Sequence, residues 1–165
     1  MASLNLVIGK IASGKSTLVS QLAQQSATVA MSEDKWLLQL YGEEIKSITD
    51  YVRLSSNLRD LLTPHIIELL KNGLSVVLDF QANTVQSRTW MKALALEAGS
   101  DSQFHFLDVP NEVCKARLRQ RNAQGRHEFS ASEEDFDRIT TYFQIPQDSE
   151  GLEIVHYPWN EEEER

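Results

Sequence analysis

The stretch between residues 9 and 16 constrains this chain more than any other. It follows the pattern G-x-x-x-x-G-K-[ST] and reads Gly9-Lys10-Ile11-Ala12-Ser13-Gly14-Lys15-Ser16. An apolar run with β-branched residues precedes it at positions 4–8, and apolar residues follow it at positions 18, 19, 22 and 23. The run predicts a strand, and the spacing predicts a helix. The motif therefore lies where a phosphate-binding loop must lie, between a strand and a helix.

Each fixed residue of this loop has a physical reason. Glycine at positions 9 and 14 allows backbone conformations that a side chain would forbid and lets the backbone approach phosphate oxygens closely. The loop amides and the start of the following helix then attract an anion. We expect Lys15 to act as a catalytic group at the β- and γ-phosphates of ATP, and Ser16 to place its hydroxyl on Mg²⁺. The predicted ATP site consists of Gly9, Lys10, Ile11, Ala12, Ser13, Gly14, Lys15, Ser16 and Thr17.

The composition is ordinary for a soluble globular protein. With 165 residues, 41% hydrophobic and 24% charged, the chain predicts a single domain over residues 1–158 and an acidic tail over residues 159–165. No apolar run has the length of a membrane span and no signal peptide is visible, so we expect a cytoplasmic protein without a membrane partner. The net charge of −8 argues against a broad nucleic-acid-binding surface. It does not exclude a local basic cleft.

Predicted strands and helices alternate along the chain. Strands are expected at 4–8, 27–31, 74–80, 104–109 and 152–156, and helices at 16–23, 33–41, 50–71, 84–98, 111–122 and 132–143. Pro64 is expected to bend or divide the third helix. The alternation predicts an α/β fold, with three α/β/α layers around a five-stranded parallel sheet. Ligands bind at the carboxyl edge of such sheets.

Carboxylates follow two of the predicted strands at this edge. A phosphoryl transferase needs one carboxylate that accepts a hydrogen bond from the attacking hydroxyl and another that helps to hold Mg²⁺. Asp34, which follows the second strand, suits the first role, and Glu33 competes for it. Asp79 ends the third strand after a run of apolar residues and suits the metal site.

Arginines form a second group of candidates. Arg117 and Arg121 are four residues apart on one predicted helix and therefore share a face, and Arg126 follows in a polar segment. A lid that carries such arginines can bind the nucleotide and neutralise charge on the transferred phosphoryl group. Arg88 begins the helix after the third strand, beyond Asp79, where we expect it to clamp an anionic group of the acceptor.

Several of these segments together resemble one known family. The phosphate-binding loop combines with Met31-Ser32-Glu33-Asp34 before a Trp-Leu-Leu helix, Val77-Leu78-Asp79, Arg88, Val109-Pro110, Arg117, Arg121-Asn122, Phe143-Gln144-Ile145-Pro146 and Glu150. This combination, which covers nearly the full chain, is similar to the small P-loop kinase-like ATPases of the AAA_33 family. That family is related to zeta toxins, chloramphenicol phosphotransferases and the kinase domain of polynucleotide kinases.

The resemblance implies a strand order of 2-3-1-4-5, ATP with Mg²⁺, an acceptor base at Asp34 and an arginine-bearing lid helix with Arg117 and Arg121. One departure concerns the acceptor. Several relatives have an arginine shortly after the aspartate of the second strand, whereas this chain offers only Lys35. A nucleic-acid 5′ end is therefore a less secure acceptor. The segment from Phe143 to Pro146 has no role evident from the residues and either closes the adenine pocket or positions the lid.

The leading hypothesis is a kinase that transfers the γ-phosphoryl group of ATP to a hydroxyl of an unidentified small-molecule or nucleotide acceptor. Phosphoryl transfer requires mostly positioning and electrostatics, so the predicted residues are chemically sufficient. The alternatives are an ATP-binding regulatory NTPase with a protein or nucleic-acid partner, and a toxin-like kinase that acts on a nucleotide sugar.

Overall fold

The computed structural model describes residues 1–125 and 130–164 of the chain. Strands and helices alternate as β1 (Ser3–Ile8), α1 (Lys15–Ala23), β2 (Thr28–Ser32), α2 (Glu33–Tyr41), α3 (Ile48–Lys71), β3 (Ser75–Asp79), α4 (Val85–Ala98), β4 (Asp101–Asp108), α5 (Asn111–Gln124), α6 (Glu133–Thr140) and β5 (Ile154–Pro158). Two short 3₁₀ helices, η1 (Asp148–Glu150) and η2 (Glu161–Glu164), lie on either side of β5. No helix among the described residues has the length and apolarity to cross a membrane.

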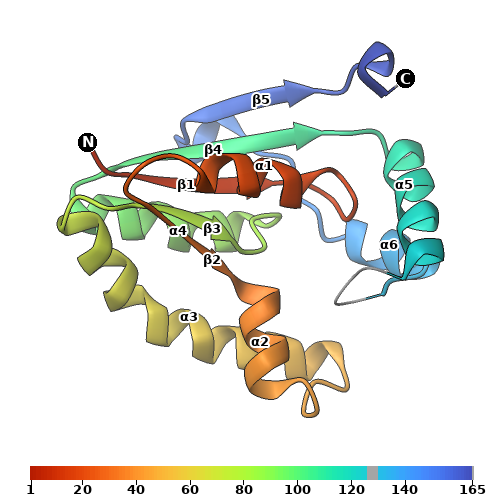
Figure 1. The fold of residues 1–165 in the computed structure, drawn as a ribbon, viewed down its shortest axis with the longest axis horizontal. Helices are drawn as coiled ribbons and strands as arrows, with labels where there is room; N and C mark the ends of the chain where they lie inside the picture. Colours follow the sequence, from red (N-terminus) through yellow and green to blue (C-terminus); the bar gives the residue numbers. More distant parts are fainter. Residues whose placement is uncertain (126–129, 165) are drawn as a thin grey trace.

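The strands form one parallel sheet with the order β2-β3-β1-β4-β5, which confirms the predicted fold class and strand order. The alternating side chains of β1 show why the sheet is covered on both faces. Leu4, Leu6 and Ile8 pack into a core with residues of α3 and α4, whereas Val7 packs on the opposite face with Leu18, Val19 and Leu22 of α1. Figure 1 shows the resulting layers, with α1 on one side of the sheet and α3 and α4 on the other.

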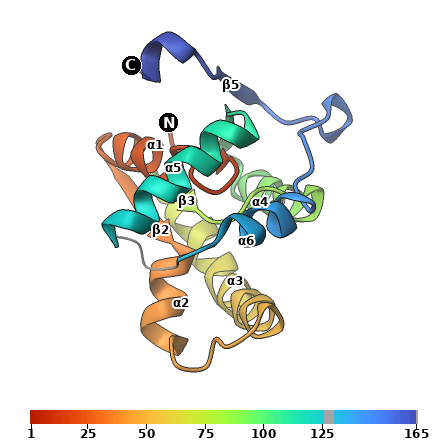
Figure 2. The ribbon, with the colours of Figure 1, turned by 90° about the vertical axis from the view of Figure 1, so that its right-hand side faces the viewer.

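All strands point the same way, so their carboxyl ends meet at one edge of the sheet. Figure 1 shows the loop between β1 and α1, the start of α2 and the helices α5 and α6 at that edge. Turned by 90°, the molecule shows α6 between α5 and α4, with α2 and α3 below them (Figure 2). The edge that ligands use in such folds is therefore surrounded by segments from both the first and the second half of the chain.

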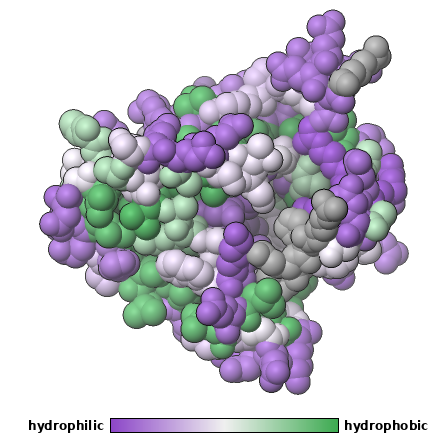
Figure 3. All heavy atoms as spheres, in the orientation of Figure 1, coloured by the Kyte–Doolittle hydropathy of each residue, from purple (hydrophilic) through white to green (hydrophobic). Residues whose placement is uncertain are grey.

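Three segments differ from the sequence-based expectation. Pro64 does not divide α3, which runs unbroken from Ile48 to Lys71, because Leu62, Ile66 and Ile67 on both sides of the proline are buried in the core. Helix α6 ends at Thr140 rather than near residue 143. The acidic tail is not free along its length: Trp159 packs against a cluster with Val109 and Leu118, and η2 follows as a hydrophilic projection in Figure 3.

Candidate functional site

The loop between β1 and α1 has the backbone that a phosphate site requires. Gly14 has φ = 98°, a left-handed conformation that favours glycine, and it forms the N-cap of α1. A Cβ at Gly9 would lie 2.3 Å from Ser13 Oγ, so a side chain there would collide with the Ser13 hydroxyl. No side chain caps the N-terminus of α1 and no acidic residue lies in its first turn. The helix therefore presents its amides and its positive end to an anion.

Ser13 gives an independent indication of a ligand at this loop. Its hydroxyl is buried and finds no hydrogen-bond partner among the described residues. A buried hydroxyl without a partner costs free energy, so such groups are usually found where a ligand or water completes the hydrogen bond. Together with the open start of α1, this side chain fits the phosphates of a nucleotide.

Lys15 and Asp79 face each other across the ends of β1 and β3. Lys15 Nζ lies 4.0 Å from Asp79 Oδ1, and both side chains are partly buried. Ser16 follows in the exposed first turn of α1. A carboxylate and a hydroxyl are oxygen ligands of the kind that Mg²⁺ uses, and Mg²⁺ usually keeps several waters. The described residues contain no group of three or more His, Cys, Asp or Glu side chains that could hold a metal, so these two residues match only a partly hydrated Mg²⁺.

Asp34 lies in the first turn of α2, whose N-cap is Ser32. The Tyr51 hydroxyl donates a hydrogen bond of 2.9 Å to Asp34 Oδ1. Surrounding protein partly desolvates the Asp34 carboxyl and raises its pKa, while the bond from Tyr51 and the positive charge of Lys15 offset part of that rise. Burial and the nearby carboxylates raise the pKa of Tyr51, so its hydroxyl keeps its proton and acts as the donor. The structure thus brings Asp34 into the electrostatic field of Lys15 and Asp79.

Glu33, the competitor of Asp34, occupies a different environment. Its side chain is 1% exposed. It accepts hydrogen bonds from Ser55 Oγ, from Arg59 Nε at 3.1 Å and Nη2 at 3.3 Å, and from the amide of Gln81 at 3.3 Å. Both carboxylate oxygens are therefore engaged within the protein, whereas Asp34 remains exposed to solvent.

A short loop after β3, residues 81–84, connects three parts of the site. The Gly9 amide donates to Asn83 Oδ1 at 3.1 Å, and the Gln144 amide donates to the Asn83 carbonyl at 2.8 Å. The Gln81 amide bonds Glu33, the neighbour of Asp34. Sequence reasoning missed Asn83. Its only signal is a polar side chain shortly after a strand that ends at the ligand-binding edge.

Arg88 does not lie where the sequence suggested. The side chain is fully buried. Its Nε and Nη2 atoms donate to the two carboxylate oxygens of Glu150 at 2.8 Å and 3.1 Å, and its Nη1 donates to the Ala82 carbonyl at 3.0 Å. A guanidinium turned inward and paired in this way cannot clamp an acceptor. It was mispredicted because Glu150, 62 residues away, gives no local signal in the sequence.

The same ion pair explains the position of the segment that begins at Phe143. Glu150 is held by Arg88, and its carbonyl accepts a bond of 2.9 Å from Lys92 Nζ. The Phe143 ring stacks on Phe106 with centroids 6.3 Å apart, and Lys10 Nζ lies 5.8 Å from the Phe143 centroid. The segment therefore joins α6 to the sheet beside the phosphate-binding loop.

One arginine of α5, Arg117, reaches the loop from the other side. Arg117 Nη1 donates to the Ala12 carbonyl at 3.4 Å, and Arg117 Nη2 pairs with Glu164 of η2. The Arg121 guanidinium is partly buried, which lowers its pKa, and its Nε has no partner among the described residues. Arg126, the third expected lid arginine, lies outside the described residues.

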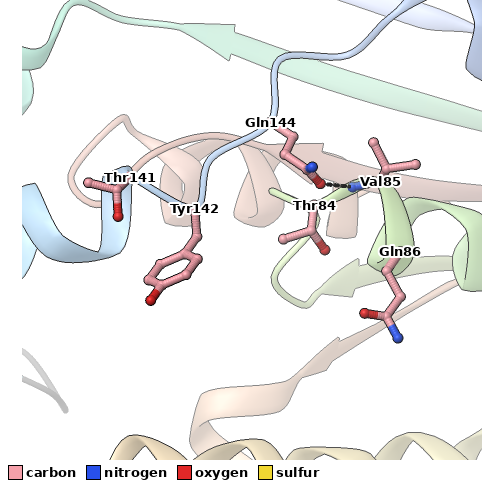
Figure 4. A pocket seen from close by; sticks show the side chains of 6 residues that line it. All are labelled: Thr84, Val85, Gln86, Thr141, Tyr142 and Gln144. Atoms are coloured by element: carbon pink, nitrogen blue, oxygen red, sulfur yellow. Dashed lines mark hydrogen bonds between the residues drawn. The ribbon is translucent and has the colours of Figure 1, made fainter.

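Two hollows lie beside the loop at residues 81–84. The larger is an open pocket of about 540 Å³ lined by Thr84, Val85, Gln86, Thr141, Tyr142 and Gln144. Figure 4 shows the side chains of Thr84, Gln86, Thr141 and Tyr142 around it, with Gln144 turned to the amide of Val85. The smaller hollow is lined by Lys10 and Ile11 of the phosphate-binding loop, and by residues of the same two segments as the larger pocket.

Known structures share this fold over nearly the whole chain. Kti12 from Chaetomium thermophilum, in complex with ADP-AlF3, has a TM-score of 0.72 and 17% identity over 95% of this chain and 89% of Kti12. A sugar kinase from Janibacter sp. HTCC2649 has a TM-score of 0.62 and 18% identity over 96% of this chain and 86% of that chain. The APS kinase CysC from Mycobacterium tuberculosis, in complex with AMPPNP and APS, has a TM-score of 0.59 and 21% identity over 99% and 92%.

These identities are low, so the three structures establish the fold and no more. A comparison with curated protein sequences gave no match. The sequence profile of the AAA_33 family, described as an AAA domain, matches residues 4–146. Since that match covers most of the chain, from β1 to the segment after α6, the protein belongs to the AAA_33 family.

Proposed function

We propose that the protein is a kinase that transfers the γ-phosphoryl group of ATP to a hydroxyl of an unidentified small-molecule or nucleotide acceptor. The observation that carries this proposal is the environment of Asp34. An exposed carboxylate with one oxygen held by Tyr51 lies within the electrostatic influence of Lys15, the lysine of the phosphate-binding loop. The second oxygen has no hydrogen-bond partner among the described residues, and in this proposal it accepts a hydrogen bond from the acceptor hydroxyl.

The residues divide the work of such a reaction among them. The loop amides and Lys15 hold the β- and γ-phosphates, while Ser16 and Asp79 hold Mg²⁺, which neutralises phosphate charge when bound. Asp34 accepts the proton of the acceptor hydroxyl while the oxygen of that hydroxyl bonds to the γ-phosphorus. The bond from that phosphorus to the β,γ-bridging oxygen breaks, leaving ADP and a phosphorylated acceptor. A raised pKa suits Asp34 to this role, because a general base works best when its pKa approaches the operating pH.

Arg117 supplies positive charge from the opposite side of the loop. It already contacts the loop at Ala12, so a small side-chain movement away from Glu164 would bring it toward the phosphates. Arginine at such a place stabilises the charge that develops on the transferred group. Arg121, on the same face of α5, is proposed to support nucleotide binding.

The test separates the donor site from the base. Lys15→Ala should weaken ATP binding strongly, because it removes the positive charge that the loop presents to the phosphates. Asp34→Asn should reduce acceptor-stimulated ATP consumption by at least two orders of magnitude. The ATP affinity, measured by calorimetry, should stay unchanged. Asp101→Asn is the matched control, since Asp101 is an exposed carboxylate at the start of β4, at the opposite edge of the sheet. Equal turnover of Asp34→Asn and wild type would refute the assignment of the base.

One alternative function, a regulatory NTPase, is also supported by a specific observation. The TM-score to Kti12 bound to ADP-AlF3, 0.72, is higher than the 0.62 and 0.59 to the two kinases, although its identity is no higher. An ATP-binding regulatory NTPase without a small-molecule acceptor is therefore compatible with this fold. This alternative expects ATP hydrolysis that no hydroxyl compound stimulates. A screen of hydroxyl compounds by coupled ADP detection therefore discriminates between the two functions.

A further inference from the structure

The pocket at the start of α4 is large enough for a small organic molecule. Its volume is about 540 Å³, within the range of sites for such ligands. The smaller hollow continues along the same two segments: Asn83, Thr140 and Phe143 line it, and their sequence neighbours Thr84, Thr141 and Gln144 line the pocket. Lys10 of the phosphate-binding loop also lines the smaller hollow. The pocket therefore adjoins the proposed donor site.

Hydrogen bonds also link the segment that lines the pocket to Glu33, the residue beside the proposed base. Gln81 bonds Glu33, the neighbour of Asp34, and Thr84 lines the pocket only three residues later. Three residues span at most about 10 Å even when fully extended. Arg59 likewise donates both to Glu33 and to Ser87 Oγ in the first turn of α4, so two sets of hydrogen bonds join the start of α4 to the residue beside Asp34.

The groups that would bind an anion at this pocket are already used inside the protein. The first-turn amides of α4 at Val85 and Ser87 donate to the side-chain oxygens of Gln144 at 2.8 Å and Thr84 at 3.1 Å. Arg88, the cation of that turn, is fully buried against Glu150. By contrast, the N-terminus of α1 has no side-chain cap. Two amides at the start of α4 are thus occupied by side chains of the protein, whereas the start of α1 has no side-chain cap and is more open to phosphate or sulfate.

The remaining lining groups suit hydroxyls. Gln86 contributes an amide, Thr84 and Thr141 contribute hydroxyls, and none of the described lining residues is charged. Amides and hydroxyls both donate and accept hydrogen bonds, as the hydroxyls of a sugar do. Tyr142, 70% exposed, adds an aromatic face and a further hydroxyl at the rim (Figure 4).

We infer that this pocket binds the phosphoryl acceptor and that the acceptor is an uncharged, hydroxyl-rich molecule of the sugar or nucleoside type. The inference rests on the proposed kinase activity. It goes beyond it by excluding acceptors that already carry a phosphate or sulfate, and by placing the specificity in the uncharged side chains of Gln86, Thr141 and Tyr142.

Matched pairs of acceptors test the charge. Glucose and glucose 6-phosphate, ribose and ribose 5-phosphate, and uridine and uridine 5′-monophosphate are offered with ATP and Mg²⁺, and ADP release is measured. The uncharged member of a pair should stimulate release, and its phosphorylated partner should not. The pairs also distinguish a free sugar from a nucleoside as the source of the hydroxyl. Stimulation by the phosphorylated members alone would overturn the inference and leave the kinase proposal standing.

Variants test the pocket. Gln86→Ala should raise the KM for the active acceptor about tenfold, through loss of one or two hydrogen bonds, while the KM for ATP stays unchanged. Tyr142→Ala, at an exposed position that does not endanger folding, should act in the same direction. Gln21→Ala, an exposed glutamine on α1, is the control. An unchanged acceptor KM in both pocket variants would overturn the assignment of the pocket. If no compound stimulates turnover and Asp34→Asn hydrolyses ATP like wild type, the kinase proposal fails and the inference fails with it.

Discussion

The ion pair between Arg88 and Glu150 predicts a large loss of stability when one partner is removed. Arg88 is fully buried, Glu150 is 10% exposed, and the two groups share a pair of hydrogen bonds at 2.8 Å and 3.1 Å. Glu150→Gln removes the compensating charge and leaves a buried guanidinium. Breaking a buried pair in this way costs about 3–5 kcal/mol. For a chain of this size each kcal/mol lowers Tm by roughly 2–4 °C, so we expect a decrease of roughly 6–20 °C.

A double-mutant cycle separates the pair from its surroundings. Arg88→Met also breaks the bond to the Ala82 carbonyl and should destabilise the fold by a similar amount. The double variant should lose clearly less than the sum of the two single changes, because no charge is then left unpaired. Urea unfolding followed by circular dichroism measures each free energy. A loss below 1 kcal/mol in Glu150→Gln would refute the assignment of Arg88 as a structural residue.

The pair also has a defined pH dependence. The bonds from Arg88 are the largest cause that lowers the pKa of Glu150 below its usual 4.5. A carboxylate whose folded-state pKa is depressed contributes stability that is fully present above the unfolded pKa. We therefore expect the difference in unfolding free energy between wild type and Glu150→Gln to be constant near neutral pH. It should shrink below about pH 4.5, as the pH falls through the folded-state value.

Three further changes have clear expected outcomes. Gly14→Ala forces a side chain into a left-handed conformation, so it should cost about 1–2 kcal/mol in urea unfolding and prevent ATP binding; wild-type affinity would contradict the account of the loop. Tyr51→Phe removes the bond that lowers the pKa of Asp34, so the acid limb of the pH profile of kcat/KM should move to higher pH, and an unmoved limb would show that Tyr51 does not act on Asp34. Glu164→Gln removes the charge that pairs with Arg117, so the ATP affinity measured by calorimetry should rise about twofold to fivefold, because a partly exposed pair has only a small effect. An unchanged affinity would mean that the pair does not compete with the nucleotide.

Much of the fold could be predicted because its signals are local. The apolar runs of β1 and β3, the G-x-x-x-x-G-K-S loop and the N-cap at Ser32 each lie within a few residues, and the structure has the corresponding elements within about two residues. The strand order came from the resemblance to a family and was confirmed. Boundaries were less accurate. Helix α6 and strand β5 differ by two or three residues, because their ends depend on tertiary contacts rather than on periodicity.

The candidate site was predictable only where one residue carries the signal. Lys15 follows from the loop motif, and Asp79 and Asp34 follow from their places after strands. Lys15 Nζ lies 4.0 Å from Asp79 Oδ1, and the charges of both residues act on Asp34. Tyr51 lies 17 residues from Asp34, and Asn83 lies 74 residues from Gly9, so neither contact leaves a pattern in the sequence. Arg88 is the opposite case, since a residue that looked exposed by position is buried by a partner that the sequence could not reveal.

The open start of α1 and the filled start of α4 have a practical consequence for inhibitor design. No side chain caps the start of α1, whereas two first-turn amides of α4 donate to the side chains of Gln144 and Thr84. A compound that joins both proposed substrates should therefore carry its negative charge at one end only. Its phosphate chain belongs entirely on the part that enters the glycine-rich loop, and the part that reaches Gln86 should carry hydroxyls alone. Adding a charge to that second part would cost affinity, because none of the described residues that line the pocket is charged.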